Sequence, residues 1–363
     1  MEEGSLTVGK DADWYKPAET ILLTGAGFTK NFRGYLASEM WAAILSQPEI
    51  NRDFDLRKEM LNELDYEEIY DRIMKPDGYR DDQKSSFRTA LSNAYQQMHE
   101  AICTEDVDPG HLNSAAAACR HLIRRFAGSK DKRTRGFFFT LNQDLFVERF
   151  YLNTDPTESI DIAGLPRSSP RWFNGSLGVQ LESDDWVMLP DHDWVQKYKA
   201  GCWSKGSYCP LAYIKLHGSY GWQFHDGTPG VVIGHAKTDL LKREPLLNWY
   251  QLLFEQVLCA GDRRLVVIGY GFNDEHINAV IARAINHHRL KLYPIYPYSP
   301  KDFQQELGVN IVSGFANPKP HCKEIWNGLA GYFPIKVTEL YDQQSSSRLP
   351  ARGKQLLRAV GLI

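Results

Sequence analysis

Paired cysteines are missing from this sequence of 363 residues. No two of its six cysteines form a C-x-x-C pair, so a four-cysteine zinc site is not expected. The first sixteen residues, MEEGSLTVGKDADWYK, hold no apolar segment of the kind found in a signal peptide. A disulfide framework is therefore also not expected in a chain this long. We expect a cytoplasmic protein without a bound metal.

Long apolar runs and an excess of charge are missing as well. No stretch approaches the roughly eighteen consecutive apolar residues of a membrane-spanning helix. The formal net charge is only −3, which gives no reason to expect direct nucleic-acid binding or attachment to a membrane surface. With 43% hydrophobic and 24% charged residues, the composition is typical of a globular protein. The length suits one core with a sizeable insertion.

Short apolar runs alternate with helical patterns along most of the chain. We expect strands at 21–23, 137–141, 211–216, 263–269 and 291–297, and helices at 35–47, 87–102, 111–128, 245–261 and 321–333. Asp226 and Gly227 lie between two β-prone runs, which predicts a hairpin. The alternation predicts an α/β fold with a mostly parallel sheet and helices on both faces.

Three regions depart from this alternation. A helical region at 35–127 and an irregular insertion at 151–210 fall within a main domain that we expect to span 1–300. Residues 301–363 are expected to form a C-terminal extension. Its last part is Ser-rich and then basic and apolar. This tail is either free and disordered or an assembly element that docks on another subunit.

A Gly-x-Gly turn follows the first expected strand, in LLTGAGFTKNF. Gly25, Ala26 and Gly27 allow a tight turn that can bring backbone N–H groups close to a phosphate. The third glycine of a complete G-x-G-x-x-G pattern is absent, because Lys30 stands in its place. An ordinary strand–helix turn explains the same pattern.

Polar residues directly follow the run of three Phe residues at 137–139. Asn142 and Asp144 either line a crevice at the strand end, or Asn142 caps the following helix with Asp144 in its first turn. His217 follows the strand at 211–216 in the same way. It could act as a general base near neutral pH, although a structural His is the commoner case.

A fourth strand end carries the segment VVIGYGFNDEHIN. Gly269 and Gly271 follow the strand, and Asn273 and Asp274 open the next helix, where they could also be ordinary caps. Each of the four motifs is weak alone. Together they indicate one crevice, because ligands in open α/β sheets bind beyond the carboxyl ends of the strands.

In this order the four motifs resemble those of the sirtuin superfamily. GAGFT at 25–29 resembles its GAG-(I/F)-S phosphate loop, with Thr29 in place of Ser. TLNQD at 140–144 resembles its T-Q-N-x-D motif, with Leu141 in place of Gln. KLHGS at 215–219 resembles the segment that holds the catalytic His, and IGYGFNDEHIN at 268–278 is similar to the GYSxxDxHIN segment of the bacterial sirtuin-like branch. The resemblance covers roughly residues 18–300.

The resemblance implies a Rossmann-like NAD-binding fold and roles for the site residues. Asn142 would orient a ribose hydroxyl or the attacking water, His217 would accept a proton from one of them, and Asp144 would hold the loop or stabilise the ribosyl cation. The turn at 25–27 would hold the pyrophosphate, and Asn273 and Asp274 would lie near the adenosine end. The catalytic candidates are thus Asn142, Asp144 and His217, and the NAD-binding candidates are Gly25, Ala26, Gly27, Phe28, Thr29, Gly269, Asn273 and Asp274.

Two departures separate the chain from the sirtuin deacylases. It has no four-cysteine zinc module, and the P-D-F-R segment is missing from its usual place, since NFR at 31–33 comes too early. In both respects the chain resembles the sirtuin-like effectors of bacterial anti-phage systems, which hydrolyse NAD+, and among them the subunits that assemble with a HerA-type ATPase.

This resemblance implies an NAD+ hydrolase that releases nicotinamide and ADP-ribose, takes NAD+ as its substrate, needs no metal and forms a homo-oligomer. The alternative is a subunit that binds NAD+ or ADP-ribose without turnover. A redox Rossmann enzyme is disfavoured by the missing third glycine and by the lack of an acidic residue at a second strand end.

Overall fold

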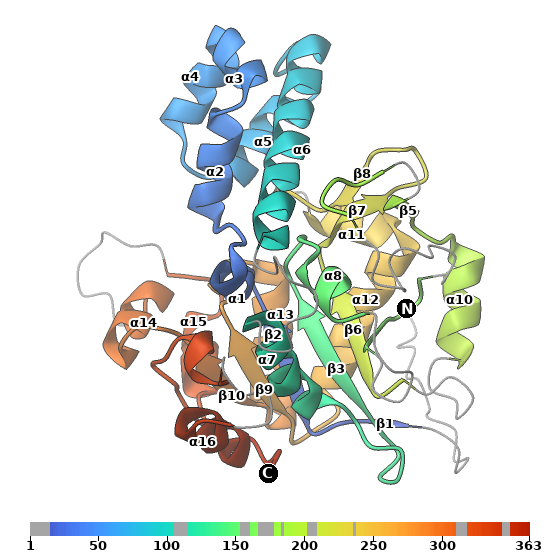
Figure 1. The fold of residues 1–363 in the computed structure, drawn as a ribbon, viewed down its shortest axis with the longest axis vertical. Helices are drawn as coiled ribbons and strands as arrows, with labels where there is room; N and C mark the ends of the chain where they lie inside the picture. Colours follow the sequence, from blue (N-terminus) through green and yellow to red (C-terminus); the bar gives the residue numbers. More distant parts are fainter. Residues whose placement is uncertain are drawn as a thin grey trace.

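A parallel sheet forms the centre of the computed structural model, which describes residues 15–104, 115–152, 160–165, 178–182, 185–201, 209–234, 237–309, 318–342 and 349–363 (Figure 1). The strand order is β10-β9-β2-β3-β6-β4, β1 pairs with β3, and all of these pairings are parallel. The strands are β1 (Lys16–Pro17), β2 (Thr20–Thr24), β3 (Thr134–Thr140), β4 (Ile160–Ile162), β6 (Leu211–Lys215), β9 (Arg264–Ile268) and β10 (Lys291–Ile295). The predicted α/β, Rossmann-like architecture is confirmed.

The run of three Phe residues is buried because the central strand β3 has no solvent-exposed face. Phe137, Phe138 and Phe139 are each at most 1% exposed. Successive side chains of a strand point to opposite faces. The ring centroid of Phe138 accordingly lies 4.9 Å from that of Tyr213. The ring centroid of Phe139 lies 5.0 Å from that of Phe254 on α12 (Pro245–Leu258). A continuous apolar run is what a doubly covered parallel strand requires.

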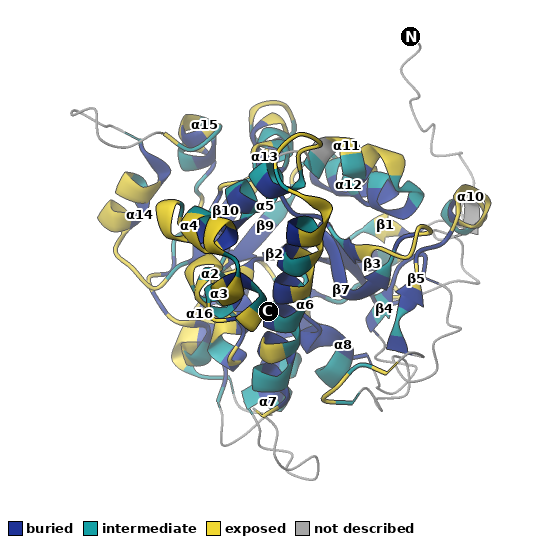
Figure 2. Ribbon diagram, turned by 90° about the horizontal axis from the view of Figure 1, so that it is seen from above, coloured by how far each residue is buried: buried dark blue, intermediate teal, exposed yellow. Residues whose placement is uncertain are grey.

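Helices cover both faces of this sheet, as expected (Figure 2). Helices α12 and α13 (Glu275–His288) lie on one face, and α7 (Ala115–Ile123) lies on the other. The other elements around the sheet are α1 (Ala26–Thr29), η1 (Lys30–Phe32), η2 (Arg124–Phe126), α8 (Phe146–Phe150), α10 (His192–Gly201), α11 (Lys237–Arg243), α14 (Pro300–Leu307), α15 (Cys322–Asn327), η6 (Val337–Glu339) and α16 (Ala351–Ala359). None of the helices in the described ranges is long and apolar enough to cross a membrane.

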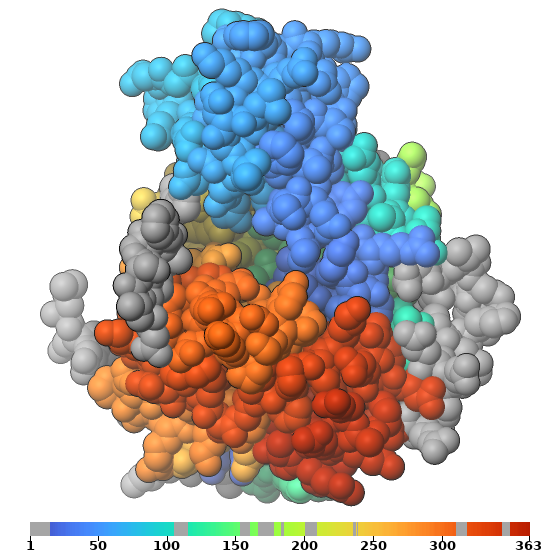
Figure 3. Space-filling view, turned by 90° about the vertical axis from the view of Figure 1, so that its left-hand side faces the viewer, coloured from blue at the N-terminus to red at the C-terminus, as the bar shows by residue number. Residues whose placement is uncertain are grey.

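A helical unit stands above the carboxyl ends of the strands (Figure 1). It contains α2 (Ala37–Leu45), α3 (Pro48–Arg52), α4 (Phe54–Asn62), α5 (Tyr66–Met74) and α6 (Asp81–Cys103). A loop at 75–80 separates α5 from α6. The expected helical region 35–127 is divided into two parts. Helices α2 to α6 form the helical unit, whereas α7 packs on the sheet. Figure 3 shows the surface hollowed between the helical unit and the C-terminal part of the chain.

The insertion at 151–210 contributes short elements in its described parts. β4 extends the edge of the sheet beside β6, and β5 (Val187–Met188) joins a small sheet with β7 (Gly218–Gln223) and β8 (Pro229–Val231). β7 and β8 are antiparallel, and the turn at Asp226 and Gly227 lies between them, so the predicted hairpin is confirmed.

Two expectations for the C-terminal extension are wrong. The helix expected over 321–333 ends at Asn327, because the chain from Gly328 onward runs beside β10 and forms bridges there, Leu292 with Leu329 and Ile295 with Phe333. This part of the extension thus packs along the β10 edge of the sheet.

The tail is folded onto its own chain. Leu356 and Leu357 of α16 are fully buried, and the Thr20 hydroxyl at the start of β2 donates a hydrogen bond to the Val360 carbonyl at 2.7 Å. The interpretation of a free tail is therefore wrong for 349–363. Of the apolar residues that were expected to dock on another subunit, Leu356, Leu357 and Val360 are buried, Leu349 and Leu362 are half-buried, and Ile363 is exposed. The Ser-rich part at 343–348 lies outside the described residues.

Candidate active site

One cavity opens at the carboxyl ends of the strands, where β2 and β9 are neighbours. The sheet continues from β2 to β3 on one side and from β9 to β10 on the other, so this is the topological switch point at which α/β folds bind ligands. The cavity volume is about 640 Å³, within the range of small-molecule and cofactor sites. The helical unit supplies the opposite wall with Tyr35, Met40, Tyr66, Glu67 and Tyr95.

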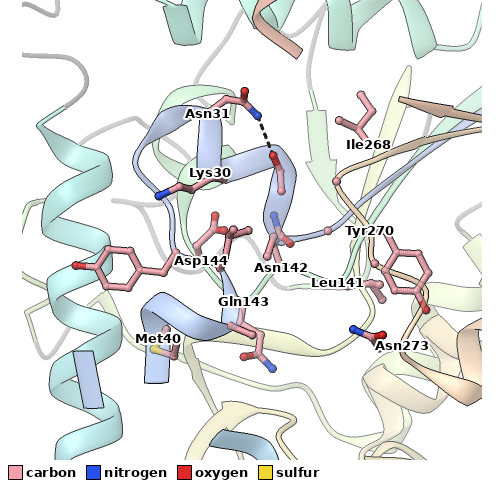
Figure 4. Close-up of a pocket in the computed structure, with 18 of the residues that line it drawn as sticks. Lys30, Asn31, Met40, Leu141, Asn142, Gln143, Asp144, Ile268, Tyr270 and Asn273 are labelled. Atoms are coloured by element: carbon pink, nitrogen blue, oxygen red, sulfur yellow. Dashed lines mark hydrogen bonds between the residues drawn. The ribbon is translucent and has the colours of Figure 1, made fainter. Parts of the chain in front are cut away.

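Most of the residues predicted from the sequence line this cavity (Figure 4). They are Gly25, Ala26, Gly27, Asn142, Asp144, His217, Gly269, Asn273 and Asp274. Phe28 and Thr29 do not, because α1 turns both side chains inward, where they are 1% and 2% exposed. Phe28 packs among aromatic rings, and Thr29 accepts a hydrogen bond from Asn142 at 3.1 Å.

The glycines after β2 and β9 allow the two loops that follow these strands to contact each other closely. The Gly25 N–H donates to the Ile268 carbonyl at 3.0 Å, and the Gly27 N–H donates to the Gly269 carbonyl at 2.9 Å. A Cβ on Gly27 would lie 2.8 Å from the Gly269 Cα. Two N–H groups expected to face a phosphate are thus used within the protein, and the loops form one rigid floor for the cavity.

Replacing Gly269 with Ala tests this floor. Gly269 has φ +66°, and a Cβ there would lie 2.2 Å from the Phe28 nitrogen. We expect Gly269→Ala to lower the free energy of unfolding by more than about 2 kcal/mol, measured by urea denaturation. Gly227→Ala is the matched control: its φ is +79°, but nothing lies within 4 Å of the added Cβ, so a loss near ~1 kcal/mol is expected. Equal losses in the two variants would contradict the close-contact argument.

The loop after β3 holds Asn142 and Asp144 in different ways. The Asn142 backbone N–H donates to the Thr140 hydroxyl at 3.1 Å, and its side-chain amide donates to the Thr29 hydroxyl at 3.1 Å. One oxygen of Asp144 accepts from the Phe146 N–H at 3.0 Å, at the start of α8. The capping interpretation is therefore wrong for Asn142, whose side chain lies in the cavity wall. Asp144 precedes Leu145, the N-cap residue of α8, and so does not lie in the first turn.

Gln143, between these two residues, fastens the loop to its surroundings. Its amide donates to the Val232 carbonyl at 2.7 Å and to the His217 carbonyl at 3.2 Å, and its carbonyl accepts from the Tyr95 hydroxyl of α6. The loop is thereby tied both to the helical unit and to the backbone of His217.

A buried ion pair lies directly beneath the site. The Lys215 ammonium at the end of β6 is 2.6 Å from a Glu148 carboxylate oxygen and also donates to the Asp144 carbonyl. Both side chains of the pair are fully buried. Burial raises the pKa of Glu148, against the opposing charge of Lys215. The pair connects the segment that carries Asp144 to β6, the strand that directly precedes His217.

His217 is a buried and neutral imidazole. It is 4% exposed, and burial lowers its pKa to about 3, while Asp274 acts in the opposite direction. Its Nε2 lies 3.1 Å from Nε2 of His276 and 3.9 Å from a carboxylate oxygen of Asp274. A neutral imidazole can accept a proton, so the structural interpretation of this His does not exclude a catalytic one.

Lys237 joins two carboxylates beside the histidines. Its ammonium lies 2.9 Å from Asp274 and 2.6 Å from Glu67, which belongs to α5 of the helical unit. Burial alone would lower the pKa of Lys237, but the two carboxylates outweigh it and raise the pKa. Burial would likewise raise the pKa of Asp274, which instead falls to about 2. The charges of His217 and Lys237 beside this carboxylate cause that fall.

Asp274 occupies the cap position of α13 without capping it. It is the N-cap residue, but its side chain accepts no hydrogen bond from the helix and is turned to Lys237. This carboxylate lies beside His217 and not at a separate end of the cavity. The structure thus places Asp274 beside His217, whereas the resemblance implied a place near the adenosine end.

Three of these groups have the geometry of a metal site. Ligand atoms of His217, Asp274 and His276 all lie within 4.8 Å of one another. Lys237, however, places its ammonium 2.9 Å from the carboxylate that would have to bind the cation. Two positive charges on one carboxylate repel each other, so the donor set fits a divalent metal poorly while Lys237 is in place. The expectation of a metal-free site stays a prediction for elemental analysis to test.

Three residues of the site were missed by the sequence reasoning. His276 follows Asp274 in the segment NDEHIN, and this Asp-x-His spacing was the signal that could have found it. Lys237 and Glu67 carry no such signal, since charged residues on helices are exposed by default. A scan against models of known protein families found no match to this chain, and a search of curated proteins found no similar sequence.

Proposed function

We propose that this chain is an NAD+ hydrolase that cleaves the bond between nicotinamide and ribose. The observation that supports it is the convergence of Asn142, Asp144 and the neutral His217 on the cavity floored by the glycine loops of β2 and β9. This combination offers a base, an amide and a carboxylate around one reacting centre, at the switch point where α/β folds bind nucleotides.

The proposed reaction breaks the C1′–N bond of the nicotinamide riboside. Positive charge builds on the ribose as nicotinamide leaves as a neutral molecule, and water adds to C1′. The Asp144 carboxylate favours that charge electrostatically. The Asn142 amide donates to Thr29, which leaves its carbonyl oxygen to accept a hydrogen bond from water or a ribose hydroxyl. His217 takes the proton that the water loses, and the products are nicotinamide, ADP-ribose and that proton.

The rest of the cavity suits the rest of the substrate. Tyr296 and Tyr298, beyond the end of β10, line its far arm, where aromatic rings can contact an adenine base. Lys30 and Lys336 also line the cavity and bring positive charge within reach of a diphosphate. The adenosine half of NAD+ would therefore extend toward β10 and the nicotinamide half toward His217.

The test is to incubate the purified chain with NAD+ and to separate the products by chromatography. Equal amounts of nicotinamide and ADP-ribose support the proposal. Saturable NAD+ binding without loss of NAD+ would favour the binding-only subunit, and formation of reduced cofactor would favour a redox enzyme. Either of those outcomes contradicts hydrolysis.

The pH dependence of turnover is a further prediction. His217 is the base, and its pKa is lowered to about 3 by burial, so the imidazole stays unprotonated well below the usual pKa of about 6.5. Among the groups that face it, Asp274 stays ionised and Lys237 stays charged across neutral pH. We expect kcat/KM for NAD+ to change less than about twofold between pH 8 and pH 6, with loss only at lower pH. A loss centred near pH 6.5 would contradict a buried neutral base.

The biological setting is proposed from the motif resemblance alone. We propose that the chain depletes NAD+ in anti-phage defence as a homo-oligomer together with a HerA-type ATPase. Because Leu356, Leu357 and Val360 of the tail are buried against their own chain, assembly would use other residues. Light scattering of the full chain, and turnover measured with and without the ATPase, test this part separately from the chemistry.

A further inference from the structure

Two histidines lie side by side at this site. The Nε2 atoms of His217 and His276 are 3.1 Å apart, with ring centroids 5.2 Å apart and rings tilted by 40°. Each neutral imidazole has one N–H donor and one acceptor nitrogen. A hydrogen bond between the two Nε2 atoms therefore uses one nitrogen of each ring. The two Nδ1 atoms remain available for other hydrogen bonds or for a proton.

The backbone and the ring of His217 are held by different groups. Its carbonyl oxygen accepts from the Val232 N–H at 3.0 Å and from the Gln143 amide at 3.2 Å. Within the described ranges, His276 is the one residue that hydrogen-bonds its ring, because Asp274 lies too far away at 3.9 Å. The ring orientation thus depends on His276.

His276 itself sits on a well-anchored element. It lies in the first turn of α13, which buries Ile277 and Ile281. The Asn278 amide donates to the Phe272 carbonyl at 2.8 Å and to the Pro320 carbonyl at 3.0 Å, which pins the same turn. His276 is not among the residues that line the cavity, so it acts through His217.

We propose that His276 is a positioning residue that fixes the ring orientation and the tautomer of His217, and this rests on the proposed hydrolysis. His276 accepts the hydrogen bond of the His217 Nε2–H, which makes Nδ1 of His217 the nitrogen that takes the proton from the attacking water. Asp274 balances the positive charge that then forms on His217, and the proton is released to solvent after the products leave. Lys237 and Glu67 keep Asp274 in place.

Two substitutions at 276 separate hydrogen bonding from bulk. Phe has a ring of similar size and no acceptor, whereas the Gln carbonyl oxygen can accept from His217. We expect His276→Phe to lower kcat for NAD+ about 10- to 100-fold with KM changed less than threefold, and His276→Gln to keep kcat within about threefold of wild type. His287→Phe, an exposed residue on the same helix, is the matched control and should behave as wild type. Equal loss in the Phe and Gln variants, or no loss in either, would overturn the proposal.

A second measurement does not depend on turnover. Nitrogen NMR of the ¹⁵N-labelled histidine rings reports which ring nitrogen of His217 carries the proton. We expect Nε2–H in the wild-type chain and in His276→Gln, and a mixture of tautomers in His276→Phe. An unchanged His217 signal in His276→Phe would overturn the positioning role even if the chain hydrolyses NAD+. A wild-type chain without hydrolysis but with the expected tautomers would instead remove the proposed function and leave the histidine pair.

Discussion

NAD+ turnover is expected to fall by about two to four orders of magnitude when His217 is replaced by Ala, the usual contribution of a positioned general base. The reason is specific to this site. Burial lowers the pKa of the imidazole to about 3, so it is neutral at physiological pH, and the Asp274 carboxylate 3.9 Å away favours the protonated form that proton transfer creates. Water alone would have to lose that proton in the variant. The comparison is made on steady-state rates of nicotinamide release.

NAD+ turnover is expected to fall by about two orders of magnitude in the Asn142→Ala variant, for a different reason. Its amide fixes the side chain against Thr29 and leaves a carbonyl oxygen for water or a ribose hydroxyl, so its loss removes orientation and not the base. His225→Ala, an exposed position on the β7–β8 hairpin, serves as the control for both variants. If either variant still binds ADP-ribose and keeps near wild-type turnover of NAD+, that residue has no part in the mechanism.

Both variants need a stability measurement beside the rate. His217 is 4% exposed and Asn142 is 8% exposed, so both lie within the protein and not on an open surface. Removing either leaves a buried partner without its hydrogen bond, at a cost of about 1–3 kcal/mol. Thermal unfolding should therefore show folded but somewhat less stable chains. A variant that fails to fold would be replaced by His217→Gln or Asn142→Asp, which retain polar atoms there.

The largest loss of stability is expected at Lys215. Replacing it with Met leaves the Glu148 carboxylate fully buried and without its counter-charge, and breaking such a pair costs about 3–5 kcal/mol. The Asp144 carbonyl also loses its donor, so the loop that carries Asn142 should loosen. Urea denaturation gives the free energy of unfolding. Lys291→Met, at the exposed start of β10, is the control and should change it by less than about 0.5 kcal/mol.

The double variant Lys215→Met, Glu148→Leu separates two explanations of that loss. If the cost comes from an unpaired buried charge, removing both charges should recover most of the stability, because apolar replacement of a buried pair is often neutral. If the double variant stays as unstable as the single one, the hydrogen bond from Lys215 to the Asp144 carbonyl carries the stability instead.

Much of the fold was predictable because it depends on local pattern. A strand buried on both faces needs an unbroken apolar run, and FFFT in β3 provides it whatever its neighbours are. The polar residues after β3, β6 and β9 were predicted to meet because carboxyl ends of parallel strands share one edge. The cavity brings Asn142, His217 and Asp274 together at that edge. The prediction failed where local pattern was misleading, as for the end of α15, which Gly328 interrupts.

Other features were decided by packing alone. The sequence by itself determined the sheet, the strand-end motifs and the glycines between β2 and β9, since these follow from backbone geometry and apolar periodicity. It could not determine that Thr29 faces Asn142 rather than the cavity, that the tail packs on its own chain, or that Glu67, Lys237 and Asp274 form one partly buried chain of charges. Lys237 and Asp274 are 37 residues apart, and a charged residue on a helix is solvated unless tertiary contacts remove the water. Only the folded chain brings these charges partly out of water and next to one another.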